Sequence, residues 1–191
     1  MRNHLVIFAK APRLGLAKRR LAADIGAVEA ARFQRTALGR TVRRLARDGR
    51  WETWLAATGG PYNWPAGVRR MPQPAGDLGE RMDRTIRGFA PGPVVVVGSD
   101  IPDIAPTHVA AAFRALGRHD AVFGPADDGG YWLVGLRRRP SQPDLFRPVR
   151  WSTRHALADT VANLGDRYDH ALLETLTDVD DAASLARWRA G

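Results

Sequence analysis

Four consecutive valines, at residues 94–97, constrain the fold of this chain more than any other feature. A strand with apolar side chains on both faces must be covered on both sides, as happens in parallel sheets. A second short apolar run, at residues 5–9, leads into a loop that contains proline and glycine, which is typical of a buried strand. These two runs predict a sheet that lies between helical layers.

The remaining segments alternate between the periodicities of strands and helices. Further strands are predicted at residues 51–57, 67–71, 121–123 and 131–136, and from residue 171. Helices are predicted over residues 18–47 with a break at Gly26, from Asp77 as an N-cap, over 106–116 and 153–164, and from residue 181. Strands that alternate with helices predict an α/β sandwich with a largely parallel sheet, formed by residues 1–191 as a single domain.

The composition of the chain argues against disulfide-bonded, membrane-spanning and nucleic-acid-binding proteins. The absence of cysteine excludes disulfides and thiolate metal sites, and the apolar runs are too short to span a bilayer, so we expect a cytoplasmic protein. The net charge of +9 raises the question of nucleic acid. The arginines are spread along the chain and do not alternate with exposed aromatic residues, so we expect no nucleic-acid partner. The sequence is compatible with a homodimer.

Ligands of such sheets bind at the carboxyl ends of the strands, so the loops there matter most. The first loop carries both lysines of a chain that has 29 basic residues, Lys10 and Lys18. A lysine ammonium serves as a point charge for phosphate, and the amide groups at a helix start also bind anions. Lys10, Lys18 and Arg20 therefore predict an anion site.

Two acidic segments lie at other strand or helix ends. Asp100 directly follows the valine strand. It is a candidate ligand for Mg²⁺, because this ion needs only one or two protein carboxylates. The alternative role, an aspartate in a turn before a helix, fits Asp103 better. The run at residues 177–181 holds three aspartates in four positions. Either Asp180 or Asp181 caps the last helix, or the run supplies a second metal carboxylate, and the residues alone leave both readings open.

Two further loops combine small and polar residues. Residues 73–82 suit close approach of the backbone to a ligand. In residues 124–132, Asp127 and Asp128 either form a hairpin turn or orient an acceptor.

The chain contains, in order, the motifs Phe-Ala-Lys-Ala-Pro-x-x-Gly-x-x-Lys-x-Arg-Leu, Gln-x-x-Gly-Asp-Leu-Gly-Glu-Arg-Met, Gly-Ser-Asp-Ile-Pro, Gly-Pro-Ala-x-Asp-Gly-Gly-Tyr-Trp-Leu-x-Gly, Trp-Ser-Thr and Asp-Val-Asp. With these motifs it resembles a bacterial family known as DUF2064, whose members are assigned as GT-A glycosyltransferases of the nucleotide-diphospho-sugar transferase type. It is more distantly similar to phospholactate guanylyltransferases and molybdenum-cofactor nucleotidyltransferases. The resemblance covers nearly the whole chain and implies a three-layer α/β/α sandwich with a mainly parallel mixed sheet.

The resemblance also implies roles for individual residues. Asp100 and Asp180 would hold Mg²⁺ or Mn²⁺, and Asp100, Lys18 and Asp128 would be catalytic. One departure is visible, since the family pattern Lys-Thr-Arg-Leu reads Lys-Arg-Arg-Leu from Lys18 onward. The implied nucleotide site consists of Lys10, Pro12, Gly15, Lys18, Arg20, Gln73, Gly76, Asp77, Gly79 and Ser99. The implied acceptor side consists of Asp127, Gly129, Gly130, Tyr131 and Trp151.

Two reactions fit these residues, and both use a nucleotide-activated donor and a small-molecule acceptor. The family assignment favours glycosyl transfer from a nucleotide sugar, in which Asp128 or Asp127 would be the base. The Ser-Asp-x-Pro sequence at Asp100 is more typical of nucleotidyl transfer from a nucleoside triphosphate. The alternative from another class is a nucleotide- or nucleic-acid-binding module without catalysis, which leaves the clustered aspartates unexplained.

Overall fold

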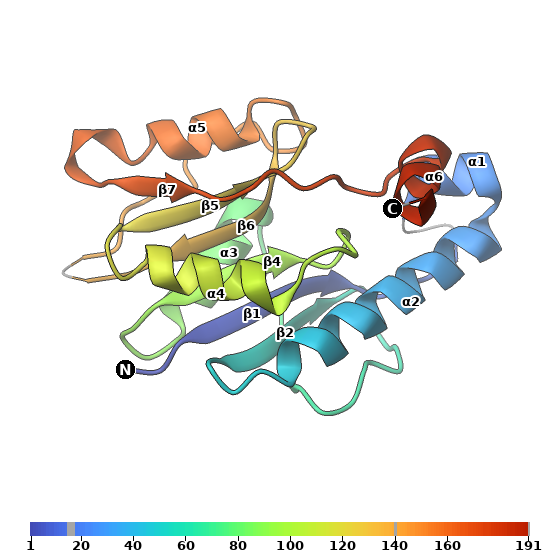
Figure 1. The fold of residues 1–191 in the computed structure, drawn as a ribbon, viewed down its shortest axis with the longest axis horizontal. Helices are drawn as coiled ribbons and strands as arrows, with labels where there is room; N and C mark the ends of the chain where they lie inside the picture. The colour runs from blue at the N-terminus through green and yellow to red at the C-terminus, as the bar shows by residue number, and fades with distance from the viewer. Residues whose placement is uncertain (15–17, 140, 191) are drawn as a thin grey trace.

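The computed structural model describes residues 1–14, 18–139 and 141–190, which form one seven-stranded sheet with helices on both faces (Figure 1). The spatial order of the strands is β3-β2-β1-β4-β6-β5-β7. Strand β6 runs antiparallel to β4 and β5, whereas the other neighbours are parallel. The predicted mainly parallel mixed sheet is confirmed. The strands are β1 (His4–Lys10), β2 (Glu52–Thr58), β3 (Arg69–Pro72), β4 (Val94–Gly98), β5 (Ala121–Pro125), β6 (Tyr131–Leu136) and β7 (His170–Leu172).

The valine strand lies at the centre of two separate cores, as its double-sided apolar pattern predicts. Val95 and Val97 pack with side chains from α2 and α4 on one face of the sheet. Val94 and Val96 pack with side chains from α3 on the other face, to which α5 also contributes. Alternate side chains of a strand point to opposite faces, so one run of valines supports both helical layers. The helices are α1 (Arg19–Ile25), α2 (Ala27–Ala46), α3 (Leu78–Arg87), α4 (Pro106–Ala115), α5 (Ala156–Ala162) and α6 (Ala182–Ala190).

A smaller apolar cluster joins the two ends of the chain. Leu21 of α1 packs with Leu185 of α6 and with Val179, which precedes α6. Helices α1 and α6 therefore lie side by side beyond the carboxyl ends of β1 and β4 (Figure 1). The indole of Trp188 also donates a hydrogen bond to Asp103, at 2.8 Å, which ties α6 to the turn after β4. This packing brings the 178–180 segment next to the loop that follows β1.

Local signals explain where the helices begin and end. Gly26 has φ +89°, which ends α1 before α2 starts, as the predicted break requires. Asp77 accepts a hydrogen bond from the Glu80 amide, and Glu80 returns one to the Asp77 amide, so the predicted N-cap of α3 is a full capping box. Helix α5 starts at Ala156, later than predicted, because Thr153 bonds to the Arg150 carbonyl and the His155 amide in a preceding turn. No helix in the described residues is long and apolar enough to cross a membrane.

Candidate functional site

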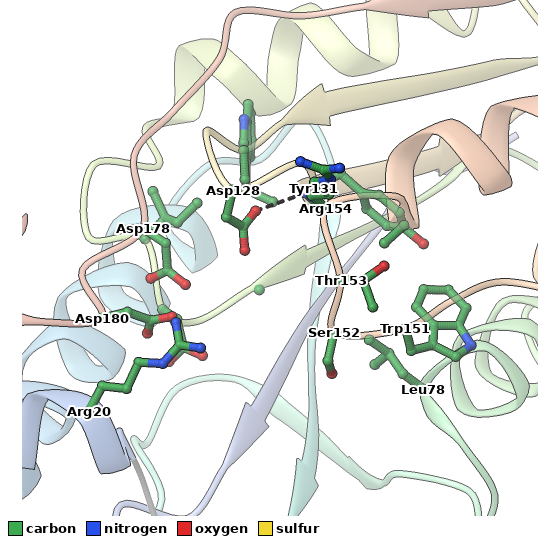
Figure 2. A pocket seen from close by; sticks show the side chains of 17 residues that line it. Arg20, Leu78, Asp128, Tyr131, Trp151, Ser152, Thr153, Arg154, Asp178 and Asp180 are labelled. Carbon is green, nitrogen blue, oxygen red and sulfur yellow. Dashed lines mark hydrogen bonds between the residues drawn. The ribbon is translucent and has the colours of Figure 1, made fainter.

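The carboxyl edge of the sheet contains a cavity of about 610 Å³, which we call the carboxylate cavity. Asp178, Asp180 and Arg20 line one side of it, and Leu78, Trp151, Ser152 and Thr153 line the other (Figure 2). Asp100, directly after β4, and Asp128, in the β5–β6 hairpin, also line it. The aspartates come from three distant segments of the chain, so only the fold brings them together.

Lys18 lies at the centre of three of these carboxylates. Its Nζ atom is 2.8 Å from Asp180 Oδ1 and 3.0 Å from Asp178 Oδ1. Asp100 Oδ1 is 3.8 Å away from the same atom. The Lys18 side chain is only 3% exposed, whereas the side chains of Asp100 and Asp180 are about half exposed, at 49% and 48%. The ammonium group therefore sits beneath two carboxylates that face the cavity.

Burial and charge act against each other in this cluster. Desolvation disfavours the charged Lys18 ammonium, but the carboxylates of Asp100, Asp178 and Asp180 outweigh it and raise the pKa of Lys18. Desolvation also raises the pKa of Asp178 to about 7, because the attraction of Lys18 only partly offsets burial and the repulsion of Asp180 and Asp100. A cluster with three carboxylates and one ammonium group therefore carries an excess of negative charge when all of its groups are ionised.

The cluster contains carboxylates of the kind that bind a divalent cation, but their arrangement is not that of a metal site. Within the described ranges, no group of three or more histidines or acids is arranged to hold a metal ion. The three carboxylates instead converge on the Lys18 ammonium, which is a stand-in cation at this position. Mg²⁺ needs only one or two protein carboxylates, and the metal roles of Asp100 and Asp180 stay predictions.

The hairpin between β5 and β6 presents Asp128 to the carboxylate cavity (Figure 2). Asp128 Oδ1 accepts a hydrogen bond from the Gly130 amide at 2.8 Å, so the hairpin-turn reading of this residue also holds. Gly129 has φ +85°, and a Cβ atom there would lie 2.3 Å from the Arg154 carbonyl oxygen. Glycine is therefore required where the hairpin meets the 150–155 turn. Asp127 is exposed beside it.

A second cavity, of about 630 Å³, lies at the carboxyl ends of β2 and β3, and we call it the aromatic cavity. Tyr62 and Trp64 line it, with their rings edge to face and 5.0 Å apart between centroids. Gly59 and Gly60 follow β2 at its rim. None of these residues was predicted from the sequence, although two consecutive glycines shortly after a predicted strand were a usable signal.

The Gln73 loop forms part of the aromatic cavity, but its polar groups are already bonded. The Gln73 amide nitrogen donates to the carbonyls of Ala9 and Ala56, and its oxygen accepts from Arg81. This side chain therefore fixes the loop against β1 and β2. A contact between its side chain and a nucleotide stays a prediction.

The three residues after Gln73 in the predicted nucleotide site have evident structural roles. Asp77 caps α3, and Gly76, at φ +116°, lies against the Glu80 side chain of the same capping box. A Cβ atom on Gly79 would lie 2.6 Å from the Trp151 ring. The nucleotide roles of these three residues remain predictions.

Of the other predicted residues, some line the carboxylate cavity and others line neither cavity. Lys10 is the exposed last residue of β1, Pro12 is buried behind it, and Ser99 is buried next to Asp100. Gly15 lies outside the described residues. Arg20, Gly130, Tyr131 and Trp151 line the carboxylate cavity. Asp178 is the site residue that sequence reasoning missed, although it belongs to the Asp-Val-Asp run.

Comparisons with known proteins support the family and the fold. A family model described as an uncharacterized protein conserved in bacteria (DUF2064) matches residues 29–153. A solved structure from Desulfovibrio desulfuricans G20, provisionally described as a nucleotide-diphospho-sugar transferase, is 30% identical. It covers 97% of this chain and 85% of its own, with a TM-score of 0.88. A search of curated proteins finds no match.

Two more distant structures share the fold. One is a CMP:2-keto-3-deoxy-manno-octonic acid synthetase complexed with CTP, at 12% identity, TM-score 0.60, and coverage of 100% and 98% of the two chains. The other is glucosyl-3-phosphoglycerate synthase from Mycobacterium tuberculosis, in complex with Mn²⁺, UDP and glucosyl-3-phosphoglycerate. Its identity is 11% and its TM-score 0.61, with coverage of 97% of this chain and 75% of that one. The α/β fold of the GT-A and nucleotidyltransferase type is thus established.

Proposed function

We propose that this chain, which belongs to the DUF2064 family of bacterial proteins, is a metal-dependent glycosyltransferase that acts on a nucleotide-diphospho-sugar. One observation carries the proposal: Asp128 lines the same cavity as a cluster of carboxylates that already binds a cation, the Lys18 ammonium. Such a cavity offers both charge for donor phosphates and a carboxylate base for an acceptor. The similarity to the Desulfovibrio desulfuricans protein supports the same class of donor.

The order of the strands supports a position for each part of the donor. Strand β1 lies between β2, which leads to the aromatic cavity, and β4, which leads to Asp100. The carboxyl end of β1, where Lys10 lies, is therefore flanked by the two cavities, and Lys18 directly precedes α1. In the proposed complex, the nucleoside occupies the aromatic cavity, the phosphates lie near the two lysines and Arg20, and the sugar enters the carboxylate cavity.

A divalent cation on Asp100 and Asp180 would supply positive charge to the donor diphosphate. The chain's own cations contribute in the same direction: Lys18 and Arg20 offset the negative charge that develops on the leaving diphosphate. Positioning and charge neutralisation suffice for this chemistry, so no protein nucleophile is required.

Asp128 is the proposed general base. In the reaction, the hydroxyl oxygen of the acceptor attacks the anomeric carbon of the sugar. The bond between that carbon and the phosphate oxygen breaks, and the nucleoside diphosphate leaves. Asp128 takes the proton of the hydroxyl group, which makes the oxygen a better nucleophile. Its exposed carboxylate, held by the Gly130 amide, suits this role.

A second candidate is nucleotidyl transfer, which the arginines of the carboxylate cavity favour. Arg20 and Arg154 both line this cavity, and guanidinium groups suit an acceptor phosphate. In this reaction an oxygen of that phosphate attacks the α-phosphorus of a nucleoside triphosphate, and pyrophosphate leaves. An ionised phosphate has no proton to lose, so Asp128 has no role as a base.

A thermal-shift screen tests the donor first. Nucleotide sugars and nucleoside triphosphates are added with and without Mg²⁺ or Mn²⁺, since a ligand of the native state raises the unfolding midpoint. A metal-dependent rise with nucleotide sugars is expected. A rise with triphosphates alone would contradict glycosyl transfer, and no rise with any nucleotide would contradict both reactions.

The Asp128→Asn variant then distinguishes the two reactions. For glycosyl transfer, we expect a 10²- to 10⁴-fold slower release of nucleoside diphosphate with unchanged donor binding, because a general base contributes that much. The matched control is Asp166→Asn, at an exposed aspartate in the turn Gly165–Arg167. Pyrophosphate release that Asp128→Asn leaves intact would establish nucleotidyl transfer instead.

A further inference from the structure

We propose that Lys18 is a built-in counter-ion that opposes metal binding, and that the divalent cation replaces its ammonium group at Asp180 and Asp100. The inference rests on the proposed function, because it concerns the same carboxylates. It adds a sequence of binding events. The Lys18 ammonium group stays bound to the carboxylates until a metal ion and the donor phosphates bind together.

The first step is that the ammonium group occupies the place of a cation. Lys18 Nζ contacts Asp180 Oδ1 at 2.8 Å and Asp178 Oδ1 at 3.0 Å, and lies 3.8 Å from Asp100 Oδ1. Its side chain is almost fully buried. A buried ammonium is stable only when it is paired, so Lys18 depends on these carboxylates as much as they depend on it.

The second step is that the backbone directs Lys18 into the cluster. Lys18 has φ 49° and ψ 54°, in the left-handed region, which a residue with a side chain adopts only where its surroundings fix it. Its carbonyl accepts the first hydrogen bond of α1, from Ala22, at 2.8 Å. The packing of α1 against α6 holds this turn next to Asp178 and Asp180. The side chain thus starts from a fixed point within reach of all three carboxylates.

The third step concerns charge. Charges of +1 and +2 on the same carboxylates repel each other, and a partly buried site screens this repulsion weakly. The ammonium therefore has to leave Asp180 and Asp100 when a metal ion binds. Asp178 is the carboxylate that can keep it, since it is the least exposed of the three, at 24%. Donor phosphates offer the displaced ammonium a further partner, so metal and nucleotide assist each other's binding.

The test is a titration of the protein with Mn²⁺ in the absence of nucleotide. The concentration of free Mn²⁺ is measured at each point by electron paramagnetic resonance. We expect Lys18→Met to bind Mn²⁺ at least tenfold more tightly than the wild type. Lys18→Gln, which loses the charge but keeps a hydrogen-bond donor, is expected to do the same, and it decides the question if the methionine variant does not fold. The matched control is Arg13→Met, since Arg13 carries the same charge on the same loop but donates to the Pro61 carbonyl. This control should bind Mn²⁺ within twofold of the wild type.

The thermal midpoint gives a second readout that needs no turnover. In a chelator, both Lys18 variants should unfold at a lower temperature than the wild type, because three carboxylates lose their cation. Mn²⁺ should raise their midpoints at least twice as far as that of the wild type.

Equal or weaker Mn²⁺ binding by both Lys18 variants would overturn the inference and leave the proposed function standing. Tighter binding by the variants, together with no midpoint shift from any nucleotide, would support the inference and overturn the proposed function. Mn²⁺ binding by none of the proteins would overturn the inference together with the proposed metal dependence.

Discussion

The two cavities at the carboxyl edge have nearly the same volume, about 610 and 630 Å³, but different chemistry. The carboxylate cavity is lined by four aspartates and two arginines, together with the aromatic residues Tyr131, Trp132 and Trp151. The aromatic cavity is lined mainly by glycine, proline and aromatic residues, with Gln73 and Arg70 as its larger polar side chains. In the proposed function, the charged side chains of the carboxylate cavity would serve the reaction and the phosphates. The aromatic cavity, which has no acidic side chain among its described lining residues, would bind the uncharged base.

The cavities also differ in how the chain builds them. The aromatic cavity is formed by residues 57–73, so it arises from one stretch of sequence. The carboxylate cavity combines segments from residue 20 to residue 180. Helices α1 and α6 pack together through a small apolar cluster, which includes Val179 between Asp178 and Asp180. The reactive part of the site thus depends on the packing of the two chain ends.

After Asp128→Asn, the largest effect is expected at Asp100. Asp100→Asn should slow nucleoside diphosphate release by about 10² to 10³-fold, which is typical when one electrostatic contact to the reacting group is removed. The matched control is Asp103→Asn, three residues later, because an amide oxygen can still accept the Trp188 hydrogen bond. Initial rates at saturating donor give the answer. Equal losses in the two variants would assign the effect to the turn and remove the contrast between the cavities.

A smaller effect is expected for the wall of the carboxylate cavity. A Cβ atom on Gly79 would lie 2.6 Å from the Trp151 ring and 2.9 Å from the Phe146 carbonyl oxygen. Gly79→Ala should therefore reduce the free energy of unfolding by about 1–3 kcal/mol, as overpacking does. Gly88→Ala, at the end of the same helix, is the control, since its Cβ would have ordinary contacts at 3.4 Å. Denaturant unfolding of both variants measures the difference, and equal stability would contradict a packing role for Gly79.

The smallest effect is expected in the aromatic cavity. Trp64→Ala should weaken binding of the donor by about 1 kcal/mol, roughly fivefold, because one stacking surface is lost. The nucleoside diphosphate should lose the same amount, and turnover at saturating donor should not change. Trp64→Phe keeps a ring and should bind nearly as the wild type does. Calorimetric titration of the wild type, Trp64→Ala and Trp64→Phe with the donor measures the three affinities. Unchanged affinity in Trp64→Ala would place the nucleobase of the donor elsewhere.

Most of the fold could be predicted because its signals are local. The valines at 94–97 demanded two covering layers, and Val95 and Val94 do pack in separate cores. The break at Gly26 and the cap at Asp77 also follow from the properties of single residues. The start of α5 was misplaced because Thr153, a good candidate for an early helix residue, bonds within a turn instead.

The site could be predicted only in part. Asp100, Asp128 and Asp180 were identified, and they line one cavity. Asp178 was missed, because nothing in the local pattern tells which aspartate of the run points to Lys18. The aromatic cavity was missed as well, since Tyr62 and Trp64 lie in a loop without a distinctive spacing.

The sequence by itself determined the layered sheet, the break at Gly26, the cap at Asp77 and the residue types available at the strand ends, because periodicity and capping act over a few residues. Only the tertiary structure decided which charges meet. Lys18 and Asp180 are separated by 162 positions, and their contact at 2.8 Å depends on the packing of α1 against α6. Electrostatic interactions depend on distance in space and on burial, and neither can be read from positions along the chain.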